Sequence, residues 1–99
     1  MLNWKYGQNK YQQYYEAKIG NDYLCVFCNE WSPDCWTAMV NDQMIWDKTF
    51  NDRQRKKQGL SKDAHISELH MSRLLTGTPD YLMKKAEYCY KHGIIEITR

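Results

Sequence analysis

Four residues of the chain have the spacing of a zinc-binding set. Cys25 and Cys28 are separated by two residues, and Cys89 and His92 repeat that interval. Three thiolates and an imidazole are sufficient for a tetrahedral zinc site. However, the Val-Phe pair between the first two cysteines favours an extended strand, on which residues three apart point to opposite faces. We therefore expect buried thiols and no cofactor, and we keep a small zinc-stabilised domain as the second alternative.

No arrangement of histidine, cysteine and carboxylate in the sequence has the spacing of a known catalytic motif. His65 and Glu68 are one helical turn apart, but no serine or cysteine stands in a recognisable nucleophile motif. The five glycines stand singly, so there is no glycine-rich phosphate loop. We therefore predict that the protein is not an enzyme.

Positive charge is concentrated just after the middle of the chain. Residues 51–62 carry five basic and one acidic side chain, whereas residues 14–50 carry two basic and six acidic ones. The dense part of the cluster could neutralise a phosphate backbone, while aromatic residues of the N-terminal segment stack on bases. Around an ideal helix the four charges spread over most of the circumference. Nucleic-acid binding is therefore the alternative function, with these residues: Arg53, Arg55, Lys56 and Lys57.

Aromatic residues are unusually frequent, with eight Tyr, four Trp and two Phe among 99 residues. A domain of this size cannot bury all of them, and exposed Trp and Tyr are the residues that most often dominate protein interfaces. We therefore predict a small protein-binding module that acts on a protein partner by occlusion or bridging; a homo-oligomer is not excluded. The candidate anchors are Trp31, Trp36, Trp46, Tyr11 and Tyr14.

Turn residues predict that residues 14–50 form a four-stranded antiparallel meander. The chain reverses at residues 20–22, 32–35 and 41–42, where Gly or Asn accepts positive φ, Pro presets φ, and Asp or Asn bonds its own backbone. Residues 1–13 show neither clear alternation nor helical spacing, so we interpret them as an irregular arm with room for a short strand.

Two or three helices are predicted in residues 51–93. Thr49 is the expected cap of the first, with Gly59 as its stop, and Ser61 is the expected cap of a second that runs to about Leu75. The clearest start signal is Thr-Pro-Asp at residues 78–80, which predicts a third helix that ends at Gly93. Residues 94–97 then form a closing strand.

These elements predict one α+β domain over residues 1–99. The chain opens without an apolar signal segment and has no run of about 20 apolar residues, so we expect a cytoplasmic protein with reduced thiols and no membrane association. In size and plan, a small meander followed by helices is similar to accessory proteins of phages and other mobile elements. That resemblance implies an inhibitor or adaptor of a host protein.

Overall fold

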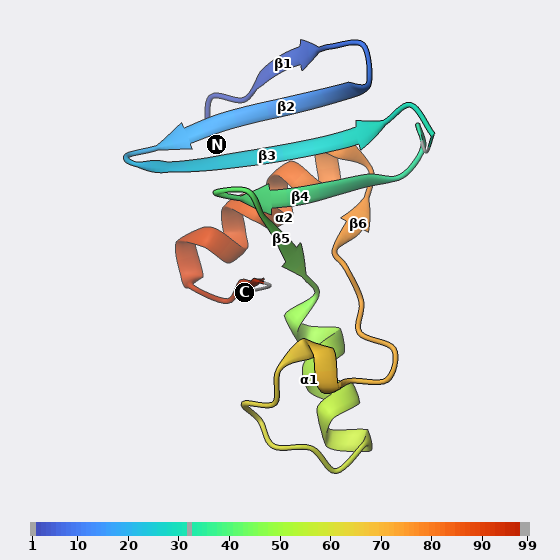
Figure 1. Ribbon diagram of the computed structural model, residues 1–99. Helices are drawn as coiled ribbons and strands as arrows, with labels where there is room; N and C mark the ends of the chain where they lie inside the picture. Colours follow the sequence, from blue (N-terminus) through green and yellow to red (C-terminus); the bar gives the residue numbers. More distant parts are fainter. Residues whose placement is uncertain (1, 32, 98–99) are drawn as a thin grey trace.

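The computed structural model describes residues 2–31 and 33–97 and has an α+β fold (Figure 1). One antiparallel sheet carries a long helix on one face, and a shorter helix with the irregular segment after it projects beyond the strand that ends at Trp46. The strands are β1 (Lys5–Gln8), β2 (Gln12–Ile19), β3 (Asp22–Asn29), β4 (Trp36–Val40), β5 (Gln43–Trp46), β6 (Thr76–Gly77) and β7 (Glu96–Ile97). The helices are α1 (Lys48–Lys57), a short 3-10 turn (Ile66–Glu68) and α2 (Pro79–His92).

The first five strands follow each other in space as they do in sequence, so the predicted meander is present and is extended at both ends. The sheet order is β1-β2-β3-β4-β5-β7, and β6 pairs with the start of β4. The N-terminal segment is therefore not an irregular arm, because Lys5–Gln8 pairs with β2 as the outermost strand. The predicted closing strand is also present, shortened to Glu96–Ile97 and paired with β5.

Two of the predicted turns join neighbouring strands with two residues each. Asn41 and Asp42 both have positive φ, 50° and 64°, as a type I′ hairpin requires. Gly20 has a φ of 58° at the turn between β2 and β3, a conformation that glycine adopts without strain. The predicted turn at residues 32–35 includes Ser32, which lies outside the described residues.

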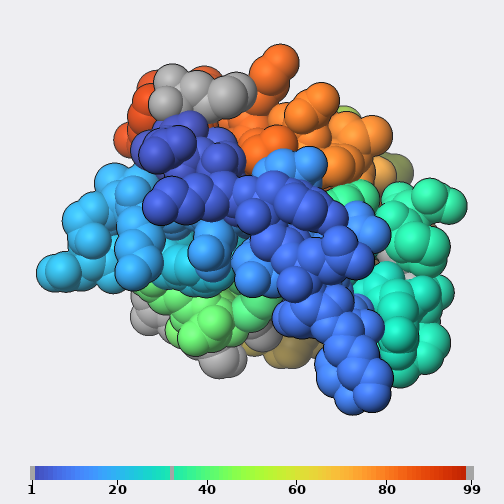
Figure 2. Space-filling view, turned by 90° about the horizontal axis from the view of Figure 1, so that it is seen from above, coloured from blue at the N-terminus to red at the C-terminus, as the bar shows by residue number. Residues whose placement is uncertain are grey.

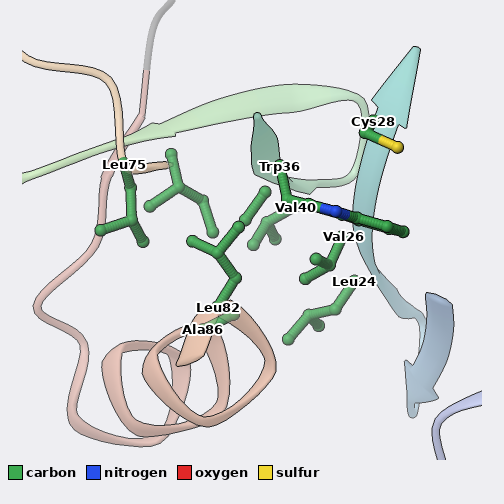
Figure 3. Packing of buried hydrophobic residues seen from close by; sticks show 10 residues of the cluster. Leu24, Val26, Cys28, Trp36, Val40, Leu75, Leu82 and Ala86 are labelled. Carbon is green, nitrogen blue, oxygen red and sulfur yellow. The ribbon is translucent and has the colours of Figure 1, made fainter. Parts of the chain in front are cut away.

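The main hydrophobic core lies between α2 and the face of the sheet that it covers (Figure 3). Alternate residues of β3 and β4 point into it, among them Leu24, Val26 and Ala38, which are fully buried. From the helix, Leu82 and Ala86, one turn apart, fill the facing side. Burying each of the larger side chains contributes about 1.5–3 kcal/mol, so this layer supplies most of the drive to fold.

Helix α2 begins and ends where the sequence predicts. The Thr78 side chain accepts a hydrogen bond from the Tyr81 amide at 3.3 Å, Pro79 occupies the first helical position, and Gly93 ends the helix with a φ of 65°. This cap is set by local sequence alone, which explains why the prediction is confirmed.

Helix α1 is capped two residues earlier than predicted. Asp47, and not Thr49, accepts the Phe50 amide, at 3.0 Å. The Asp47 amide also donates to the carbonyl of Arg73, at 2.9 Å. This distant backbone contact fixes the chain at Asp47, so the helix starts immediately after it.

The predicted helix from Ser61 to Leu75 is wrong. Apart from the 3-10 turn, that segment is irregular, and Met71 has a left-handed φ of 74°. Only short-range bonds such as Ala64 amide to Ser61 carbonyl link its own backbone groups, and several others bond to side chains of α1 or of the residue that caps it. Gln58 pairs with both the amide and the carbonyl of His70, at 3.0 and 2.8 Å, and Asn51 accepts the Arg73 amide at 3.0 Å. Tertiary hydrogen bonds therefore replace the helical ladder that local propensity favours.

Candidate protein-binding site

Two of the predicted anchors, Tyr11 and Trp31, lie at the same end of the sheet. Tyr11 is in the turn between β1 and β2, and Trp31 follows β3 in the loop that leads to β4. A backbone hydrogen bond of 2.9 Å from the Glu30 amide to the Tyr11 carbonyl ties the two loops together. Trp31 is 77% exposed and Tyr11 is 53% exposed. We call these two residues the loop pair; Figure 2 shows the β1–β2 turn reaching out beside the β3–β4 loop.

The β1–β2 turn that carries Tyr11 is rigidly built. The Asn9 side chain accepts hydrogen bonds from the amides of Tyr11 and Gln12, both at 2.8 Å, and the Asn9 amide donates to the Gln12 carbonyl at 2.9 Å. The Lys10 ammonium lies 5.5 Å from the centre of the Tyr11 ring, a cation–π contact that further restricts the ring. The exposed ring is therefore held in place before any partner arrives.

A row of aromatic rings runs from the outer strand to α2 near this end of the sheet. The Tyr6 and Tyr15 ring centres are 5.2 Å apart, and those of Tyr15 and Trp36 are 5.8 Å apart, both tilted. Gly77 pairs with Trp36, and a Cβ on Gly77 would come within 2.8 Å of the Tyr81 ring, so Tyr81 covers that glycine. We call Tyr6, Tyr15, Trp36 and Tyr81 the aromatic row. Its two ends, Tyr6 and Tyr81, are exposed.

The loop pair and the exposed ends of the aromatic row together form what we call the aromatic end. The predicted protein-binding anchors include neither Tyr6 nor Tyr81, although Tyr6 belongs to the N-terminal aromatic residues expected to stack on bases. Residues 1–13 show no clear alternation, so the exposure of Tyr6 follows only from the place of β1 as the outermost strand. Tyr81 is the third residue of α2, and the helical spacing of Leu82, Ala86 and Cys89 could have placed it outside their buried face.

The other three predicted anchors are more buried than the loop pair. Trp36 is only 8% exposed and belongs to the main core, so the prediction of an exposed anchor at this position is corrected: β4 pairs on both sides and α2 covers its inner face. Trp46 is half-buried where β5 pairs with β7, away from the aromatic end. Tyr14 is half-buried on the sheet face opposite α2, where its ring covers Gly7 of β1.

The basic cluster is divided by the fold. Arg55 is 4% exposed, and its guanidinium donates to Asp52 at 2.8 Å, to the Ala64 carbonyl at 2.8 Å and to Glu96. Burial opposes its charged form, but hydrogen bonds and charge from Glu96 and Asp52 outweigh that effect and raise the pKa of Arg55. The side-chain NH₂ of Asn51 also donates to Glu96, at 2.9 Å, so this network joins α1 to β7. Arg55 is therefore a structural residue and is not free to bind phosphate.

The remaining cations of the cluster share one face of α1. With Arg55 turned inward, Arg53, Lys56 and Lys57 are exposed at positions i, i+3 and i+4. The expectation that the charges spread around the helix is therefore corrected, because the residue that broadened the distribution is the buried one. We call these three residues the basic strip.

The four residues of the zinc alternative, Cys25, Cys28, Cys89 and His92, are not brought together. Cys28 is buried on the core face of β3, and Cys25 lies on the opposite face, where burial raises the pKa of its thiol. Cys89 is buried on α2 and His92 is exposed at its end, stacked on Tyr88 at 4.3 Å between ring centres. Among the described residues, no group of three or more His, Cys, Asp or Glu side chains could hold a metal ion.

The sheet face opposite α2 carries a second polar contact of interest. Tyr23 donates its hydroxyl proton to Glu16 at 2.6 Å, and burial together with this bond raises the pKa of Tyr23 well above its ordinary value. The phenol therefore stays protonated at neutral pH and holds the central carboxylate of this face. That pairing ties up Glu16 within the sheet.

Comparison of the chain with protein-family models, with curated proteins and with solved structures finds no match. In the described part of the chain, no helix has the length and apolar character needed to cross a membrane.

Proposed function

We propose that the protein is a non-catalytic binding module that contacts a partner protein through the aromatic end. The observation that carries the proposal is the loop pair: a tryptophan that is 77% exposed stands beside a half-exposed tyrosine on loops tied to each other by a backbone hydrogen bond. Exposed aromatic rings on a rigid scaffold lose little conformational entropy on binding, and such rings are typical hot spots. Binding would act by occlusion of the partner or by bridging, as expected of an inhibitor or adaptor.

A polar group beside the loop pair supports the same proposal. A pocket of about 90 Å³ lies between the β1–β2 turn and the end of β3, and Asn29 lines it. The Asn29 Oδ1 atom is buried and has no hydrogen-bond partner among the described residues. Buried polar atoms are nearly always paired, so this oxygen is available to a donor from a bound molecule or from water. Tyr11 lines the same pocket, which places this oxygen close to one member of the loop pair.

The experiment is affinity capture from the native cell with proteins and nucleic acids both assayed. The wild type, a Tyr11→Ala/Trp31→Ala double variant and a Met71→Ala control are compared. Met71 is 68% exposed in the loop between the 3-10 turn and β6, so it matches the apolar exposure of the loop pair at a different site. We expect a stoichiometric protein that the control retains and the double variant loses. Equal recovery by the double variant would overturn the proposal.

Nucleic-acid binding is the second candidate, and the basic strip is the observation that favours it. Three exposed cations on one helical face match a single phosphate backbone better than the dispersed cluster expected from the sequence. Replacing the three cations of the strip by alanine should reduce the slope of log affinity against log salt by about 2–3. An Arg55→Ala change would not serve as a test, because it unbalances the buried network. An unchanged slope would remove the basic strip as a nucleic-acid site.

A further inference from the structure

The outermost strand, β1, has a free hydrogen-bonding edge. In the described chain β1 pairs only with β2, and it ends the sheet order. The Asn9 amide bonds to the Gln12 carbonyl, which makes that pair a hydrogen-bonded one. Because hydrogen-bonded and non-hydrogen-bonded pairs alternate along an antiparallel ladder, Gly7 and Lys5 bond to β2, whereas Tyr6 and Gln8 point their N–H and C=O groups outward. We call these outward groups the β1 edge. Figure 2 shows that β1 (dark blue) lies at the surface when seen from above.

The β1 edge is held in position by the segment that precedes it. The buried carboxylate of Glu87, on α2, accepts hydrogen bonds from the Leu2 amide and from the Trp4 indole, the latter at 2.8 Å. The start of β1 is therefore fixed to the helix at one end and by the tight Asn9 turn at the other. An added strand would meet a preformed template and would pay little ordering entropy on the protein's side.

Positive charge surrounds this edge. Lys5 lies on β1 and Lys10 lies in the turn that follows it. Lys84 and Lys91 are exposed one turn before and one turn after Glu87, so they share the helix face that meets the N-terminal segment. Among the described residues, none of these four lysines takes part in an ion pair. Four acids also lie near the edge. Glu87 is buried and hydrogen-bonded, and Asp80 lies two turns before it on α2. Glu16 is opposite Lys5 on β2 and accepts the Tyr23 hydroxyl, and Glu30 lines a pocket together with Lys10.

We propose that the β1 edge binds an extended, acidic segment of a partner protein by strand addition. Main-chain hydrogen bonds to the outward groups of Tyr6 and Gln8 supply the pairing, and the four lysines select acidic side chains. A second copy of this chain is disfavoured as the occupant, because antiparallel pairing of two β1 strands would bring both sets of lysines together. The inference deepens the proposed function, since it names the binding mode of one part of the partner.

The test uses two synthetic nine-residue peptides, one alternating Val with Glu and one alternating Val with Lys. Amide exchange of the ¹⁵N-labelled protein is followed by NMR at millimolar peptide. The acidic peptide should slow exchange of the Tyr6 and Gln8 amides by about tenfold at saturation, and the basic peptide should not. No protection by the acidic peptide, or equal protection by both peptides, would overturn the inference.

A matched pair of variants isolates the backbone contribution. Gln8→Pro removes an N–H that points outward and makes no bond to β2, a position where an edge strand tolerates proline. Gln8→Ala shortens the same side chain and keeps the N–H. The acidic peptide should bind Gln8→Pro about tenfold more weakly than Gln8→Ala. Equal affinity would overturn strand addition.

If the proline variant proves unfolded by circular dichroism, the exchange comparison of the two peptides on the wild type still decides. The peptide experiment does not use the natural partner. A negative peptide result would therefore overturn strand addition at the β1 edge without affecting the capture test of Tyr11 and Trp31. Conversely, equal partner recovery by the Tyr11→Ala/Trp31→Ala variant would overturn the loop-pair proposal without changing the peptide result. The two proposals can therefore fail separately.

Discussion

Replacing Glu96 by alanine tests the polar network that fixes α1 to the rest of the fold. The Arg55 side chain is 4% exposed, and Glu96 is its least exposed charged partner. The change removes the main counter-charge of the buried Arg55 guanidinium and removes the acceptor of the Asn51 side-chain NH₂ group. Breaking a buried ion pair costs about 3–5 kcal/mol. Because Asp52 still pairs with the guanidinium at 2.8 Å, we expect the low end, a loss of about 3 kcal/mol in the free energy of unfolding.

Urea unfolding followed by tryptophan fluorescence measures this loss. A domain of this size has a total stability of about 5–15 kcal/mol, so the effect is large, and the melting temperature should fall by about 12–24 °C. The control is Asp52→Ala, which removes a partner whose side chain is 47% exposed and should cost less than about 1 kcal/mol. A Glu96→Ala protein within about 1 kcal/mol of the wild type would refute the reasoning that the network supports α1.

Two further predictions concern thiols and acid stability. Cys35 is exposed, whereas Cys28 and Cys89 are buried. A thiol reagent should therefore label Cys35 promptly, and Cys28 and Cys89 only on unfolding, as measured by mass spectrometry. Prompt labelling of Cys28 in the native protein would contradict the register of β3. A hydrogen bond from the Tyr90 hydroxyl, and a smaller effect from the Asn41 side chain, lower the pKa of Asp22 below its usual 3.8. The stabilisation of the fold by this lowered pKa is present above pH 3.8 and is lost as the pH falls through the pKa of Asp22 in the folded state. The difference in unfolding free energy between the wild type and Tyr90→Phe should therefore be constant near neutral pH and shrink below about pH 4, and a difference that stays constant in acid would argue against this coupling.

Local signals in the sequence were sufficient for the elements whose ends are set locally. The hairpin turn at Asn41-Asp42 and the cap of α2 at Thr78 depend on a few neighbouring residues, and both predictions are confirmed. The segment 61–75 was predicted wrongly because some of its backbone groups bond to the side chains of Asn51, in α1, and of Gln58, the residue that caps α1, which lie 22 and 12 residues away along the chain. Helical propensity cannot anticipate such competition.

The candidate site was predicted only in part, for a related reason. Exposure of Trp31 follows from its place in a loop, but burial of Trp36 depends on pairing with β6 and on cover by α2, which are long-range contacts. Arg55 reads as one more surface cation, and only the distant Glu96 shows that it turns inward. Division of the basic cluster into one buried residue and a one-sided strip was therefore not visible in the sequence.

The most direct test of the central claim is the dissociation constant of the captured partner for Trp31→Ala and for Met71→Ala, measured by calorimetry at fixed salt. If the aromatic end is the contact surface, the tryptophan change should weaken binding by about 2–4 kcal/mol, roughly 30-fold to several hundred-fold, while the control stays within about threefold of the wild type. Equal affinities for all three proteins would contradict the account.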